Sequence, residues 1–93
     1  MSERTAPALA RLDVLLPVLA TLAPGQIRDH LVEEAEALRR AVAAFHMEAI
    51  RFRMYSVDRL LGQAGNPGDT RRLFDDVRQA LETAGFHTRS HTA

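Results

Sequence analysis

A run of 36 residues without glycine or proline, from Gln26 to Leu61, constrains the fold of this chain more than any other feature. Alanine, leucine, glutamate and arginine dominate the run, and these residues have high helix propensities. The run therefore predicts one long α-helix over 26–61. Such a helix is about 54 Å long, whereas a compact chain of this size is roughly 32 Å across. Either the helix breaks near residues 43–45, or a second chain lies alongside it.

Two apolar stripes follow the predicted helix. The first has the 4-3-4 spacing of a coiled coil and comprises Leu31, Ala35, Leu38, Val42, Phe45, Ala49, Phe52 and Ser56. The second lies on nearly the opposite side and comprises Met47, Ile50, Met54, Val57 and Leu61. A helix that is apolar on two faces must be covered on two faces. We therefore expect a homodimer whose interface includes Leu31, Leu38, Val42, Phe45, Ile50, Phe52 and Met54.

A shorter helix is expected on each side of the central run, because Pro/Gly clusters at 24–25 and 62–68 separate three periodic segments. The first segment spans about residues 7–23 and carries leucines on one helical face. Pro17 lies within it, and an internal proline removes a hydrogen bond and clashes with the preceding turn. We expect this N-terminal helix to be kinked or split near Leu16.

The third segment predicts a helix over about 67–84. Asn66 is a suitable N-cap and Pro67 suits the first helical position. Gly85 fits the left-handed position after the last turn, and Phe86 is expected to pack back on Leu81.

The fold class that follows is all-α: one domain over residues 1–93, with three helices, packing as a homodimeric helical bundle. Residues 1–6 and 87–93 are expected to be flexible. Acidic residues gather at the start of the central helix and arginines in its second half. This polarity favours antiparallel pairing of two central helices.

The charge balance and the lack of cysteine exclude several functions. The chain has 12 arginines, no lysine and 12 acidic residues, so its net charge is zero and gives no global attraction for nucleic acid or anionic membranes. Without cysteine, disulfides, thiolate metal sites and thiol nucleophiles are excluded. The apolar run at 14–22 is interrupted by Pro17 and is too short to span a bilayer. We expect a cytoplasmic protein without a membrane association.

Three groups of polar residues are candidate sites. His30 and Glu34, one helical turn apart, are weak metal-ligand candidates, and a solvated helix start is the alternative. Candidates for anion or nucleic-acid contact are Arg39, Arg40, Arg51 and Arg53, for which ion pairing is the alternative. His46 is expected to be structural, hydrogen-bonded to a glutamate or a backbone carbonyl.

No nucleophile with a neighbouring base, no paired catalytic acids and no phosphate loop are recognisable by their spacing. We therefore expect no enzymatic activity and no cofactor. The leading hypothesis is a small regulatory or adaptor protein that forms a homodimer and contacts another protein through apolar helix faces. The first alternative is a nucleic-acid-binding accessory protein that uses the arginines of the central helix. The second is a ligand- or metal-sensing helical bundle.

Overall fold

Four helices and no strand make up residues 3–86, the part of the chain that the computed structural model describes. The helices are α1 (Ala6–Ala20), α2 (Gln26–Ala43), α3 (Met47–Gln63) and α4 (Thr70–Thr83). The all-α class expected from the periodicity is thus confirmed, with one helix more than the three predicted. The radius of gyration is 12.2 Å, as expected for a compact chain of this length.

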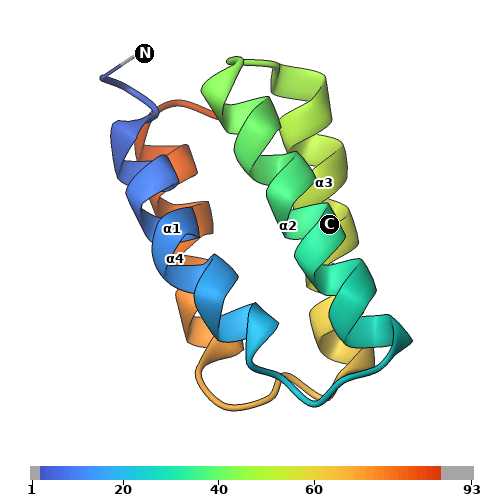
Figure 1. Cartoon of the computed structure of the whole chain (residues 1–93). Helices are drawn as coiled ribbons and strands as arrows, with labels where there is room; N and C mark the ends of the chain where they lie inside the picture. The colour runs from blue at the N-terminus through green and yellow to red at the C-terminus, as the bar shows by residue number, and fades with distance from the viewer. Residues whose placement is uncertain (1–2, 87–93) are drawn as a thin grey trace, which may run out of the picture.

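Successive helices run up and down, and α1 and α4, the first and last, pack on each other (Figure 1). In addition, α2 packs on both α1 and α3, while α3 and α4 make the least extensive contact of the neighbouring pairs. Apolar side chains from all four helices form one continuous core. The bundle is therefore two antiparallel helix pairs, α1 with α4 and α2 with α3, laid against each other.

The single helix predicted over 26–61 is wrong, because the chain turns at residues 44–46 and divides it into α2 and α3. Phe45 adopts φ 59°, in the left-handed region. The turn is a Schellman motif: the Phe45 N–H donates to the carbonyl of Val42, and the His46 N–H donates to that of Ala41. A break near residues 43–45 was one of the two alternatives, and it is the one that the structure shows.

His46 starts α3 at this turn. Its Nδ1 accepts a hydrogen bond from the backbone N–H of Ala49 at 3.2 Å, which is the N-cap interaction that Ser or Asn usually makes. The predicted partner of His46, a glutamate or a carbonyl, is therefore wrong. This N-cap interaction of His46 stabilises the start of α3 directly after the turn.

The break also explains the two apolar stripes. Before the turn, the first stripe faces the core, with Leu31, Ala35, Leu38 and Val42 buried. After the turn the helix restarts in a new phase, and the second stripe faces the same core, with Ile50, Met54, Val57 and Leu61 buried. Each helix thus has one apolar face that its own chain covers.

At the N-terminal side, α1 runs through Pro17 as one helix, so the predicted split does not occur. Pro17 is exposed and lies in the last turn, where its missing N–H affects one hydrogen bond near the helix end. Residues 3–6, which were expected to be flexible, take part in the fold: Thr5 is buried, Arg4 donates to the carbonyl of Ala84, and Ala6 begins α1. The rest of the predicted flexible ends, residues 1–2 and 87–93, lies outside the described residues.

The last helix starts later than predicted, at Thr70, with Asp69 rather than Asn66 at the N-cap position. Asn66 and Gly68 both have positive φ, so the chain makes a loop where a first helical turn was expected. The predicted end is confirmed: Gly85 has φ 97°, and the N–H of Phe86 donates to the carbonyl of Leu81 at 2.9 Å.

None of the helices in residues 3–86 has the length and apolar character needed to cross a bilayer.

Candidate interaction surface

The outward side of α3 carries a row of four side chains, which we call the α3 outer stripe. Its members are Glu48, Phe52, Tyr55 and Arg59, spaced 4-3-4 along the sequence. At 100° per residue they lie on the side of α3 opposite the buried face. All four are exposed.

Two large aromatic rings form the centre of the α3 outer stripe. Phe52 is 58% exposed and Tyr55 is 52% exposed. The chain has five aromatic residues in all, and these two are its most exposed. The same fold buries Phe74 and Phe86 almost completely, so it has the means to cover aromatic rings. Adjacent rings on one helix face are the kind of surface that marks a protein interface.

The surface is hollowed next to these rings. Glu48, Arg51, Phe52 and Tyr55 line a shallow depression on α3. They occupy positions i, i+3, i+4 and i+7 of one helix. That set of four is the hole into which a side chain of a facing helix inserts in knobs-into-holes packing. The depression therefore has the geometry of a helix-binding site.

The charges around the rings are free to meet a partner. Glu48 precedes Arg51 by three residues, but no ion pair joins them. Neither these two residues nor Arg59 has an ion-pair partner within residues 3–86. The negative charge lies at the start of the α3 outer stripe and a positive charge at its end.

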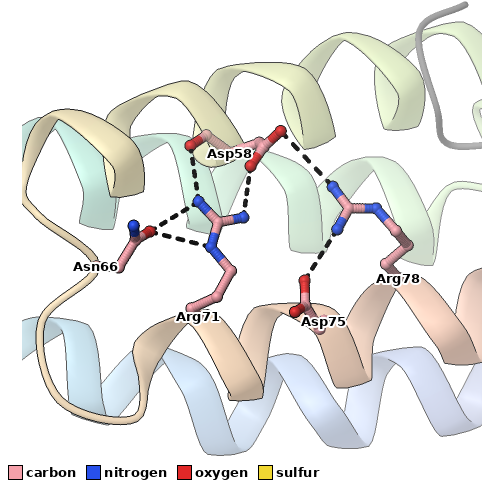
Figure 2. A network of polar contacts seen from close by, with 5 residues as sticks. All are labelled: Asp58, Asn66, Arg71, Asp75 and Arg78. Carbon is pink, nitrogen blue, oxygen red and sulfur yellow. Dashed lines mark hydrogen bonds and ion pairs between the residues drawn. The ribbon is translucent and has the colours of Figure 1, made fainter. Parts of the chain in front are cut away.

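The arginines between α3 and α4, in contrast, are paired (Figure 2). Arg71 donates to the carboxylate and to the backbone carbonyl of Asp58, and to the side-chain amide oxygen of Asn66. Arg78 pairs with Asp75 at 3.0 Å and reaches Asp58 at 3.9 Å. Asp58 is thus shared by two guanidinium groups, and this network joins α3 and α4, which make the least extensive contact of the neighbouring helix pairs.

Most of the predicted interface residues lie in the core of the same chain: Leu31, Leu38, Val42, Ile50 and Met54 are 0–1% exposed. Phe52 reaches the surface. Phe45 is 41% exposed, and its ring packs on that of Phe86 at 5.1 Å between centroids. The guanidinium of Arg4 lies over the Phe45 ring at 5.3 Å. Among the seven predicted contact residues, Phe52 is therefore the one in the α3 outer stripe.

The predicted metal ligands lie near each other, but one of them, Glu34, is already bound to an arginine. The side chains of His30 and Glu34, with Glu33, can bring ligand atoms within 4.8 Å of one another. However, Nη1 of Arg53 contacts both carboxylate oxygens of Glu34, at 2.9 and 3.0 Å. This ion pair between α2 and α3 uses the carboxylate that a metal site requires.

The four candidate arginines do not form one cationic surface. Arg53 is paired with Glu34, and its guanidinium also lies 5.0 Å from the centroid of the Phe52 ring. Arg39 on α2 makes a two-point hydrogen bond to Asp13 on α1, at 2.7 and 3.2 Å. This bond lowers the pKa of Asp13, and the pKa of Arg39 is raised by the same bond. Arg40 and Arg51 have no ion-pair partner among the described residues.

Sequence reasoning therefore found Phe52 but not its neighbours in the α3 outer stripe. Tyr55, Glu48 and Arg59 continue the same 4-3-4 spacing, but two of the three are charged, so the row does not form an apolar stripe. The signal in the sequence is an aromatic pair with an opposite charge at each end of the same helical face. Comparisons of this chain with known protein families, with curated proteins and with solved structures find no match.

Proposed function

We propose that this protein is a non-enzymatic interaction module, a small regulatory or adaptor protein that acts as a homodimer. The α3 outer stripe is its contact surface. The observation that carries the proposal is the exposure of Phe52 and Tyr55 side by side on one face of α3, in a chain that buries Phe74 and Phe86 almost completely. We propose the cytoplasm as its compartment.

The two rings offer a large apolar area for a partner to cover. Aromatic side chains contribute a large share of binding energy because they bury much area with few rotatable bonds. Their exposure in the free chain is unfavourable by about 25 cal/mol for each Å² that a partner would cover. Glu48 and Arg59, at the two ends of the stripe, have no ion-pair partner within residues 3–86, so they can supply specificity without breaking an ion pair seen there.

Self-association of the purified chain tests this proposal. We expect sedimentation equilibrium to show reversible change between the 10.3 kDa chain and a species of twice that mass, at concentrations on the order of micromolar. Phe52→Asp, which places a charge in the contact, should remain at the mass of one chain at every concentration. Because Phe52 lies outside the core, the helical content of this variant should equal that of the wild type.

Val14→Asp is the matched control, because Val14 on α1 is 54% exposed and lies outside the α3 outer stripe. This variant should self-associate like the wild type. A wild-type chain that stays single at all concentrations, or a Phe52→Asp variant that associates normally, would contradict the proposal.

A further inference from the structure

The spacing of the α3 outer stripe is the same in both directions along α3. Its spacing is 4-3-4, with an aromatic ring at each of the two inner positions and opposite charges at the two outer positions. We infer that two copies of this chain pair through these stripes with α3 antiparallel, in one register, about a two-fold axis between residues 53 and 54. This inference rests on the proposed function, because it takes the α3 outer stripe as the contact surface.

The register follows from the order of the four side chains. When two stripes are laid antiparallel about that axis, Glu48 of one copy lies opposite Arg59 of the other, and Phe52 lies opposite Tyr55. Each contact occurs twice, as two-fold symmetry requires. A parallel pair would instead place Glu48 opposite Glu48 and Arg59 opposite Arg59, so like charges would meet at both ends. The charges of the free chain thus favour one direction of pairing.

The depression on α3 supports the same register. It is lined by Glu48, Arg51, Phe52 and Tyr55. In the antiparallel arrangement the side chain that faces its centre is Tyr55 of the second copy. An aromatic ring then fills the depression, and the phenol oxygen of that Tyr55 comes near the polar rim made by Glu48 and Arg51. Tyrosine is suited to such a place because its body is apolar and its tip forms hydrogen bonds.

The size of the surface sets the strength of the pair. From Glu48 to Arg59 the stripe extends about 17 Å, or three helical turns. A stable standard interface covers about 800 Å² on each partner, and a single three-turn helix face is smaller than that. We therefore expect a dimer that dissociates on dilution. The exposed charge pairs at its ends should determine the direction in which the two α3 helices pair, and should contribute little of the binding free energy.

Charge reversal tests the direction. In the antiparallel register, Glu48→Arg and Arg59→Glu each turn two attractive pairs into two repulsive ones, so each should weaken dimerisation about tenfold. The double variant Glu48→Arg/Arg59→Glu restores both pairs and should return to within about threefold of the wild type. The differences should shrink in high salt, because these pairs are exposed. Arg11→Glu, on α1 and exposed, is the matched control and should behave like the wild type.

Crosslinking tests the register directly, since the chain has no cysteine of its own. Glu48→Cys and Arg59→Cys, mixed in equal amounts and mildly oxidised, should give a disulfide between one copy of each variant, identified by mass. Each variant alone should crosslink poorly, because equivalent positions are about 17 Å apart in the antiparallel pair and a disulfide requires Cα atoms within about 7 Å.

The outcomes separate this inference from the proposed function. If the wild type dimerises, Phe52→Asp abolishes the dimer, and yet the single charge reversals have no effect or Glu48→Cys crosslinks with itself, then the surface is right and the antiparallel register is overturned. If the wild type does not dimerise, the proposed homodimer fails first. Weakening by both single reversals, recovery in the double variant and crosslinking confined to the mixture would establish the register.

Discussion

Phe45 is the residue at which the chain turns from α2 into α3. Its φ of 59° lies where a side chain with a Cβ is strained, and the equivalent positions after α3 and α4 are Gly65 and Gly85. The contact of its ring with Phe86 and the stacking of Arg4 on it compensate for this strain. Phe45 therefore stabilises the turn through the contacts of its side chain. A glycine at this position would adopt the left-handed backbone without strain but would make no such contacts.

This balance predicts an unusual order of stability at position 45. Phe45→Gly and Phe45→Ala both lose the ring contacts, and each should lower the free energy of unfolding by about 1–2 kcal/mol or more. The alanine variant keeps the left-handed strain and should be the less stable by about 1 kcal/mol. Urea denaturation followed by circular dichroism measures both. At Glu36, exposed in the middle of α2, the order should reverse, with Glu36→Gly below Glu36→Ala. The same order at both positions would contradict the role given to Phe45.

A second residue, Asp13, links stability to pH. Its hydrogen bond from Arg39 holds its pKa below the usual value of 3.8 in the folded chain. A carboxylate with a lowered folded pKa stabilises the fold fully above its unfolded pKa, and this contribution disappears as the pH falls through the lower, folded value.

Asp13→Asn should therefore lower the free energy of unfolding at pH 7, and the difference from wild type should shrink as the pH falls below 3.8 and through the lowered folded pKa. Because the pair is exposed, the loss should be small. Chemical denaturation at pH 7, 5 and 3 measures it. A difference that is constant with pH would show that Asp13 acts by something other than its charge.

At the scale of elements, the helices were predictable from the sequence but their number was not. Helix propensity and the Pro/Gly clusters correctly place the start of the first helix, the start of α2 and the end of α4, whereas α1 ends at Ala20 rather than near residue 23. The break between α2 and α3 has neither glycine nor proline, and its cap is a histidine. Its cause is tertiary: Phe45 tolerates a left-handed backbone because Phe86, 41 residues later in the sequence, packs on its ring. No local pattern records such a contact.

The same break explains how much of the candidate surface was predictable. The sequence pattern indicates two apolar sides of one helix, although the first stripe faces the core from α2 and the second faces it from α3. That reading placed Ile50 and Met54 at an interface, whereas they are buried within the chain. Phe52 lies at the surface because the restarted helix turns it away from the core, whereas Ser56 of the same stripe is buried. The antiparallel direction expected from the charges stays a prediction, now attached to Glu48 and Arg59 on α3.

For the molecule as a whole, the contact between α3 and α4 depends on charge more than the other contacts do. These two helices make the least extensive contact of the neighbouring pairs, and the Asp58 carboxylate bridges them by accepting from Arg71 and by lying near Arg78 (Figure 2). Both guanidinium groups also stack near the buried Phe74 ring, at 5.8 and 5.0 Å. Removing the shared carboxylate leaves two partly buried cations with fewer partners.

We expect Asp58→Asn to lower the free energy of unfolding by about 1–2 kcal/mol. This is less than the loss of a fully buried ion pair would cost, because the network is partly exposed. Asp69→Asn is the control: Asp69 pairs with Arg72 at 3.5 Å in a largely exposed position and should change stability by less than about 0.5 kcal/mol. Urea denaturation of both variants in low and high salt gives the comparison. Equal effects of the two substitutions would show that the Asp58 network does not hold α3 to α4.

The pairing of α1 with α4 has a consequence for how the chain acquires its structure. A helix made early in synthesis has its main partner at the far end of the sequence, since Arg4 meets the carbonyl of Ala84. The leucine face of α1 therefore has only α2 to cover it until the last helix has been synthesised, whereas α2 and α3 can close over a turn of three residues. A chain interrupted before α4 would carry an uncovered apolar face, the feature that chaperones and proteases recognise in incomplete proteins.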